Sequence, residues 1–239
     1  MTDGELATFL ATEAGNILFA LQKTGSGKAI GDEGDRIANA FLCSEIRKLR
    51  PSDALLSEEE VDSRSRCSVS RVWIIDPLDG TREYSEGRSD WAVHVALAVD
   101  GIATVGAVAL PALGVTLCSE NPQILPPAND PLKIVVSRTR PAAEAVALAE
   151  KLGAQLLPMG SAGAKGMAVV RGEADIYLHT GGQYEWDNCA PVAVAQAAGL
   201  HCARLDGSPM RYNNANPYLP DLLICRRELV AGIMAALGD

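Results

Sequence analysis

The sequence lacks the hallmarks of several large protein classes. Its six cysteines are scattered without a C-x-x-C pair, which favours reduced thiols over a disulfide framework or a zinc site. A formal charge of −9 argues against a nucleic-acid partner. No apolar stretch is long enough to span a bilayer, and Asp3 and Glu5 stand where a signal peptide would be basic. We therefore expect a soluble, cytoplasmic protein without a membrane or nucleic-acid partner.

A nucleotide-binding P-loop is also missing. The glycine-rich stretch 24–28 would need Gly five residues before its Gly-Lys pair and Ser or Thr after it, but Gln22 and Ala29 occupy those positions. No Ser-His-Asp triad is recognisable. The stretch is expected to be a flexible loop between two helices. The first helix starts with a T-x-x-E capping box at residues 2–5, and the second follows the acids of residues 32–35.

The strongest positive signal is the hexapeptide D-P-L-D-G-T at residues 76–81. The apolar run 72–75 before it predicts a buried strand, which Pro77 would end because it lacks an N–H donor. Carboxylates as close as Asp76 and Asp79 repel each other unless a cation lies between them, and such oxygen ligands suit hard divalent cations. The hexapeptide therefore predicts a metal site at the end of a strand.

The last two residues of the hexapeptide add features suited to an anion. Gly80 permits backbone geometry that other residues resist, and Thr81 is expected to cap a following helix. The free N–H groups at the start of that helix would face an anion. Carboxylates for a metal and backbone donors for a phosphate would then lie side by side.

A third source of carboxylates precedes the hexapeptide. Residues 54–56 predict a short strand that runs into Ser57 and then into three glutamates, residues 58–60. If this strand neighbours the one at 72–75, Glu58 or Glu59 lies beside Asp76. Three glutamates alone would indicate only a solvated turn, but the strand-end carboxylates downstream favour a shared metal site.

The remaining pattern predicts alternating elements. Residues 91–99 and 102–110 predict two strands joined by Asp100-Gly101, a sequence typical of a hairpin turn. His94 lies among apolar residues of the first strand, which favours a buried core histidine over a ligand. Four prolines within residues 121–131 exclude regular structure and indicate a subdomain boundary. Strands and helices then alternate to the C-terminus, as in α/β proteins.

Ser-Glu-Glu, D-P-L-D-G-T and a distant Trp186-Asp187 resemble, in order and spacing, the inositol monophosphatase-like superfamily of magnesium-dependent, lithium-sensitive phosphatases. The resemblance covers nearly the whole chain. It implies a layered αβαβα sandwich of the inositol monophosphatase/fructose bisphosphatase type, α/β in class with an α+β N-terminal part. An N-terminal subdomain at 1–125 would carry the metal-binding carboxylates, and a C-terminal subdomain at 131–239 would complete the active site. A homodimer is also implied.

The resemblance assigns roles to individual residues. Asp32 and Gly34 depart from the family's T-E-A-D pattern, so that only its last position matches, at Asp35. Two or three Mg²⁺ ions would be held by Glu58, Asp76, Asp79, Asp187 and the carbonyl of Leu78. The attacking water would be oriented or deprotonated by Asp35, Glu59 and Thr81. Substrate would be bound by Asp79, Gly80, Thr81, Arg138, Ser161, Lys165 and Asp187.

Three of these residues keep a second interpretation. Asp187 and Ser161 could each simply cap a helix, and Lys165 could be an ordinary surface residue. If the helix that begins near Ser161 opens toward the site, Lys165 could instead pair with a phosphate or sulfate of the substrate.

Three segments are most similar to the CysQ branch of the superfamily, the bacterial adenosine bisphosphate 3′-phosphatases: Ser137-Arg138, the loop 160–165, and L-D-G-S-P-M-R-Y at 205–212. This implies removal of the 3′-phosphate of 3′-phosphoadenosine 5′-phosphate, and of its 5′-phosphosulfate, in sulfate assimilation. Inositol monophosphate and fructose 1,6-bisphosphate stay alternative substrates. A non-catalytic nucleotide-binding or metal-sensing protein is the alternative from another class.

Overall fold

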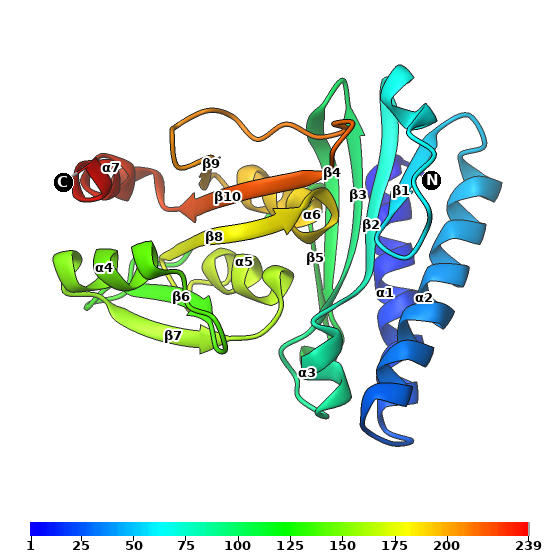
Figure 1. Ribbon diagram of the computed structural model, residues 1–239, viewed down its shortest axis with the longest axis horizontal. Coiled ribbons are helices and arrows are strands. Elements are labelled where there is room, and N and C mark those ends of the chain that lie inside the picture. The colour runs from blue at the N-terminus through cyan, green and yellow to red at the C-terminus, as the bar shows by residue number, and fades with distance from the viewer. Residues whose placement is uncertain (239) are drawn as a thin grey trace.

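The computed structural model describes residues 1–238 and has five layers of helices and sheets (Figure 1). One helix pair covers the outer face of each sheet, and a third pair lies between the sheets. The pairs are, in the order of the layers, α1 (Asp3–Gln22) and α2 (Lys28–Leu49), α5 (Ala162–Val170) and α6 (Glu185–Ala197), and α4 (Ala143–Leu152) and α7 (Val230–Gly238). This order confirms the predicted αβαβα fold.

The first sheet is formed by the N-terminal half of the chain. β1 runs parallel to β2, and the later neighbours are antiparallel. Asp100 and Gly101 have φ values of 50° and 76°, as a tight hairpin turn requires, so the predicted hairpin is confirmed. In sheet order the strands are β1 (Ala54–Ser57), β2 (Arg71–Asp79), β3 (Ala92–Val99), β4 (Ile102–Leu110) and β5 (Val115–Cys118).

The second sheet is mixed and belongs to the C-terminal half. β6 pairs in parallel with β7 and β8, whereas β10 is antiparallel to both β8 and β9. In sheet order the strands are β7 (Gln155–Met159), β6 (Lys133–Ser137), β8 (Ile176–Tyr184), β10 (Tyr218–Cys225) and β9 (His201–Ala203). The short helical segments of the chain are α3 (Thr81–Ser85) and the 3₁₀ turns η1 (Ser65–Ser68), η2 (Pro111–Leu113) and η3 (Arg227–Leu229).

The predicted end of the strand at 72–75 is wrong. β2 continues past Pro77 to Asp79, because its pairing with β3 shifts by one residue between Asp76 and Asp79. An irregularity of this kind accommodates a residue without an N–H group. The helix that follows is capped by Gly80, with φ of 91°, and not by Thr81 as predicted.

The predicted start of the second helix is also wrong. α2 begins at Lys28, so Asp32 and Asp35 lie inside the helix and not before it. Its N-cap Gly27 makes no side-chain capping bond, which explains why no local signal marks the start. The Gly27 N–H instead donates to the carbonyl of Ser85 in α3, at 2.7 Å.

Apolar side chains fill the three interfaces between the layers. One cluster lies between α1, α2 and the first sheet, a second joins both sheets through α5 and α6, and a third packs α4 and α7 on the second sheet. Trp73, Tyr84 and Trp91 are among the largest fully buried side chains. Burying such large rings is a major favourable contribution to folding. Because the middle cluster joins both halves, the division into subdomains 1–125 and 131–239 stays a prediction.

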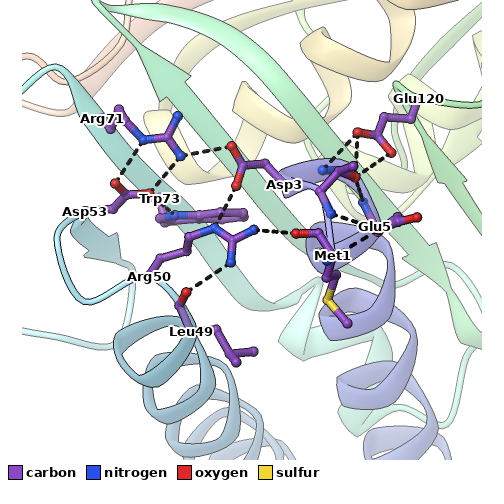
Figure 2. Close-up of polar contacts among 11 residues, drawn as sticks. Met1, Asp3, Glu5, Leu49, Arg50, Asp53, Arg71, Trp73 and Glu120 are labelled. Carbon is purple, nitrogen blue, oxygen red and sulfur yellow. Dashed lines mark hydrogen bonds and ion pairs between the residues drawn. The ribbon is translucent and has the colours of Figure 1, made fainter.

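A polar network fastens the N-terminus to the first sheet (Figure 2). The predicted capping box of Thr2 and Glu5 is confirmed. Asp3 accepts hydrogen bonds from Arg50 at 2.7 Å and Arg71 at 2.9 Å. In the same network Arg71 also donates to Asp53, which accepts from the indole N–H of the buried Trp73. The network therefore joins the start of α1, the end of α2 and the start of β2.

Candidate active site

Three carboxylates from two distant segments meet at one place. Each of Asp76, Asp79 and Asp187 offers an oxygen atom, and these atoms all lie within 4.8 Å of one another. The two aspartates of β2 are buried, whereas Asp187 is partly exposed. Asp187 lies in the first turn of α6, where its side chain accepts a hydrogen bond from the N–H of Tyr184 at 2.6 Å. Motifs that are far apart in the sequence are thus brought together.

Glu58 joins this cluster from the end of β1. β1 is parallel to β2, with Ser57 opposite Ile75, so Glu58 follows at the same end of the sheet as Asp76. Burial, together with the charge of Asp187, raises the pKa of Glu58 to about 7. Burial and then the charge of Glu58 hold the pKa of Asp76 well above its usual value. Burial followed by the charge of Asp79 raises the pKa of Asp187 to about 6.

This crowding fits a divalent cation. Carboxylates that raise one another's pKa need a positive charge between them, and oxygen-rich clusters are the sites that Mg²⁺ and Ca²⁺ prefer. The carbonyl of Leu78, a further predicted ligand, lies in the same segment and accepts from the hydroxyl of Thr81 at 3.1 Å. The carboxylates of Asp76, Asp79 and Asp187 are therefore able to hold a cation, and Glu58 as a further ligand stays a prediction.

Asp79 differs from the other carboxylates because donors surround it. The N–H groups of Ala162 and Gly163, at the start of α5, donate to its two oxygens at 3.0 and 2.6 Å. The hydroxyl of Ser161 donates to the same carboxylate and also caps α5, which confirms its N-cap position, while its role in substrate binding stays a prediction. Although burial alone would raise the pKa of Asp79, His94 and Lys165 hold it below its usual value.

The residues expected to handle water also lie together. Burial and then the nearby charge of Glu59 raise the pKa of Asp35 to about 7, whereas a hydrogen bond from Thr81 lowers it. Asn39 in α2 supports this arrangement, since it accepts from the hydroxyl of Ser57 at 2.7 Å, and Ser57 in turn accepts from the N–H of Glu59. The sequence pattern did not identify Asn39, because its contact with Ser57 depends on how α2 packs on β1.

A cleft opens beside the carboxylates. Of the predicted residues it is lined by Asp79, Gly80, Thr81, Ser161, Lys165 and Asp187. Arg140, Tyr177 and His179 also line it and were not predicted. Lys165 is 5% exposed, and its ammonium group donates to the carbonyls of Gly160 and Ser161. Lys165 is therefore an interior residue of the site and not a surface one.

Arg138 lies differently from the other predicted substrate contacts. Its guanidinium donates to Glu83 at 2.8 Å and to Glu86 at 2.6 Å, both in α3. Among residues 1–238 the cleft lining includes Arg140 but not Arg138. The role of Arg138 in substrate binding stays a prediction, and it would require these ion pairs to open.

His94 is buried in the core, as expected, but it also contacts the site. Its Nε2 atom lies 3.1 Å from a carboxylate oxygen of Asp79, and its Nδ1 atom lies 2.9 Å from the carbonyl oxygen of Trp186. A polar residue in an apolar strand was the only sign of this in the sequence.

Comparison with known proteins agrees with this geometry. A model of the inositol monophosphatase family matches residues 5–237. The chain is 46% identical over 256 aligned residues to the 3′-phosphoadenosine 5′-phosphate phosphatase of Mycobacterium leprae (strain TN), covering 100% of this chain and 94% of that protein. It is 50% identical over 220 residues to the protein of the same name from Mycobacterium tuberculosis, covering 88% and 82%.

A solved structure shows the same fold. CysQ from Bacteroides thetaiotaomicron, described as a bacterial member of the inositol monophosphatase family, superposes with a TM-score of 0.80 at 23% identity and covers 93% of this chain and 96% of its own. The family model spans almost the full length of the chain, and the fold is that of a solved member of the family. The chain therefore belongs to the inositol monophosphatase family.

Proposed function

We propose that this protein is a metal-dependent phosphatase that removes the 3′-phosphate of 3′-phosphoadenosine 5′-phosphate. The observation that carries the proposal is the carboxylate cluster of Asp76, Asp79 and Asp187, which lies beside a cleft lined by basic side chains. The names and high identity of the mycobacterial relatives support the choice of substrate. The 5′-phosphosulfate of the same nucleotide is a second proposed substrate.

The chemistry needs both a cation and groups that handle a proton. A divalent cation bound by the carboxylates would polarise a phosphoryl oxygen and lower the pKa of a neighbouring water. Asp35 is the proposed proton acceptor, because a pKa of about 7 suits a general base near neutral pH. Thr81 has one hydroxyl proton, which it can donate either to Asp35 or to the carbonyl of Leu78. We therefore assign Thr81 to orienting the water and not to accepting its proton. Glu59 would keep the pKa of Asp35 high.

The cleft also suits a substrate with a second anionic group. Arg140 and Lys165 line it together with Ser161 and the N-terminus of α5. A nucleotide bisphosphate carries a second phosphate for these cations to bind, whereas an inositol monophosphate carries only the phosphate that is removed. Arg140 is exposed and free of the ion pairs that hold Arg138, so we assign the second phosphate to Arg140 and Lys165 before Arg138.

The test is phosphate release with Mg²⁺ from 3′-phosphoadenosine 5′-phosphate, inositol 1-phosphate and fructose 1,6-bisphosphate, measured side by side and again in chelator. We expect a preference for the nucleotide and no release in chelator. Arg140→Ala should raise KM for the nucleotide about tenfold or more, and Arg138→Ala should raise it less, because Glu83 and Glu86 hold that guanidinium away from the cleft. Preference for a sugar phosphate would overturn the substrate. Absence of release from all three would favour a non-catalytic binding protein.

We also propose Mg²⁺ as the cation, with two or three ions per site, and a homodimer in the cytoplasm. All-oxygen ligands support Mg²⁺, and six free cysteines support a reducing compartment. The dimer rests on the family resemblance, and light scattering would test it. Within residues 1–238, no helix has the length and apolar character needed to cross a membrane.

A further inference from the structure

His94 is a buried titratable side chain at the site to which the proposed function gives no role. It lies in β3, opposite Asp76 in the strand register, and is completely buried. Its ring lies between two segments that each carry a carboxylate of the cluster: Nε2 faces Asp79 at 3.1 Å, and Nδ1 faces the carbonyl of Trp186 at 2.9 Å. Trp186 is the residue directly before Asp187. One ring therefore contacts both arms of the proposed cation site.

The two contacts of the ring differ in kind. Nδ1 is within hydrogen-bond distance of the Trp186 carbonyl, whereas Nε2 lies close to the Asp79 carboxylate without an aligned hydrogen bond. The ring therefore fills the space between these two oxygens, and its removal would leave both without this contact.

The packing around the ring fixes its position. A Cβ atom built on Gly163 would lie 2.0 Å from Nε2 of His94, so α5 approaches the ring more closely than any larger residue would permit. The N–H of Gly163 donates to the same oxygen of Asp79 that Nε2 faces. Ser161 and Gly163 hold Asp79 to α5, and His94 lies between Asp79 and the carbonyl of Trp186 at the start of α6.

We propose that His94 is a positioning residue that sets the separation between Asp79 and Asp187, and so the affinity of the cluster for a divalent cation. The inference rests on the proposed metal-dependent function, which it deepens. His94 does not contact the cation. It holds one ligand directly and the other through the backbone of Trp186, and such outer contacts typically change metal affinity about tenfold to a hundredfold when removed.

Three variants separate the two contacts. His94→Phe keeps a ring and removes both ring nitrogen atoms. His94→Gln places an amide donor near the position of Nε2 and loses the bond to the Trp186 carbonyl, whereas His94→Asn places one near Nδ1 and loses the contact with Asp79. The readout is Mn²⁺ binding to the full-length chain, followed by the EPR signal of the free ion without substrate. Thermal unfolding is measured on the same samples.

We expect His94→Phe to weaken Mn²⁺ binding about tenfold or more, with Gln and Asn falling between it and the wild type. Leu97→Val is the matched control, because Leu97 is a buried residue of the same strand that packs in the cluster with α1. It should lower the melting temperature without changing Mn²⁺ affinity.

Two results would overturn the inference. Wild-type affinity in His94→Phe, or in either amide variant, would show that the bridge between the two carboxylates is not needed. A proportional loss of affinity in Leu97→Val would show that general destabilisation explains the effect. If the wild-type chain itself bound no Mn²⁺, the proposed cation site would be wrong, and His94 could not have the proposed role.

Discussion

At the scale of single residues, Asp35 has the property that is simplest to test. Its pKa is raised from 3.8 to about 7 by burial and by Glu59. Between these two pKa values the carboxyl group of Asp35 keeps its proton in the folded chain and has lost it in the unfolded chain. Stability is therefore lost as the pH rises from about 4 to 7, and the loss is complete above that range.

Asp35→Asn should remove this loss. Between pH 5 and pH 8 in chelator, the wild-type melting temperature should fall by several degrees more than that of the variant, since about 2–4 °C corresponds to each kcal/mol in a chain of this size. Phosphate release should fall about a hundredfold or more, as for loss of a general base. Equal pH dependence in the two proteins would contradict the raised pKa of Asp35.

The site residues differ in how visible they are in the sequence. Asp76 and Asp79 belong to a compact motif, so their residue types and spacing alone indicate a metal site, whereas Asp187 was assigned to it only through the family resemblance. His94 is meaningful only because β3 pairs with β2 in one register and α6 docks over it, and no local pattern encodes either fact. The choice between Arg138 and Arg140 depends on which way the chain turns after β6, which residue type does not determine.

At the scale of elements, the position of α6 matters most because it carries Asp187. α6 approaches β4 at Gly106, where an added Cβ would lie 2.6 Å from the carbonyl oxygen of Ala190 and 2.8 Å from the Cβ of Ala193. Backbone cannot yield as a flexible side chain can. The absence of a side chain at Gly106 therefore sets how close α6 lies to the first sheet.

Gly106→Ala should destabilise the fold by about 1–3 kcal/mol, the usual cost of overpacking. Gly232→Ala in α7 is the control, because an added Cβ there has no described atom within 4 Å, and Ala should stabilise that helix by about 0.5–1 kcal/mol. Denaturant midpoints measure both changes. A Gly106→Ala variant as stable as the wild type would show that α6 moves freely over β4.

The order of the helices and strands could be predicted from the sequence more reliably than the residues at which they begin and end. Strand and helix positions follow from hydrophobic period, because each layer must bury one face. The start of α2 and the extension of β2 through Pro77 depend instead on tertiary contacts, namely the bond from Gly27 to Ser85 and the irregular pairing with β3. The two wrongly predicted ends lie on either side of the site, where the backbone of α2 positions Asp35 and the backbone of β2 positions Asp79.

At the scale of the whole molecule, the proline-rich connection between the sheets is held by a buried ion pair. Asp175 is 0% exposed and accepts from Arg226 at 2.9 Å, as well as from the N–H groups of Asn129 and Lys133. Arg226 also donates to the carbonyls of Pro126 and Pro127. The pair thus fixes the chain where it passes from one half to the other.

Arg226→Met should cost about 3–5 kcal/mol, because it leaves the carboxylate of Asp175 buried without a counter-charge. The double variant Arg226→Met/Asp175→Asn should recover part of this loss. Urea unfolding of the wild type, of Arg226→Met, of Asp175→Asn and of the double variant gives the coupling between the two residues. Additive effects would show that the two side chains act independently.

A bound cation should stabilise the molecule as a whole. Ligands that bind only the folded state raise its stability in proportion to the logarithm of their concentration. Metal binding requires deprotonated carboxylates, and the pKa values of Glu58 and Asp187 are raised to about 7 and about 6. The rise in melting temperature with Mg²⁺ should therefore be large at pH 8 and small at pH 5. An equal rise at both pH values would indicate a site elsewhere.

The sheet order has a consequence for synthesis of the chain. β10 lies between β8 and β9, so β9 has no neighbour in its sheet and β8 keeps an open edge until residues 218–225 have left the ribosome. β8 leads directly into α6, which carries Asp187. A nascent chain that already displays Asp76 and Asp79 therefore still lacks a settled position for its distant ligand. Catalytic competence should appear as one of the last events of biogenesis.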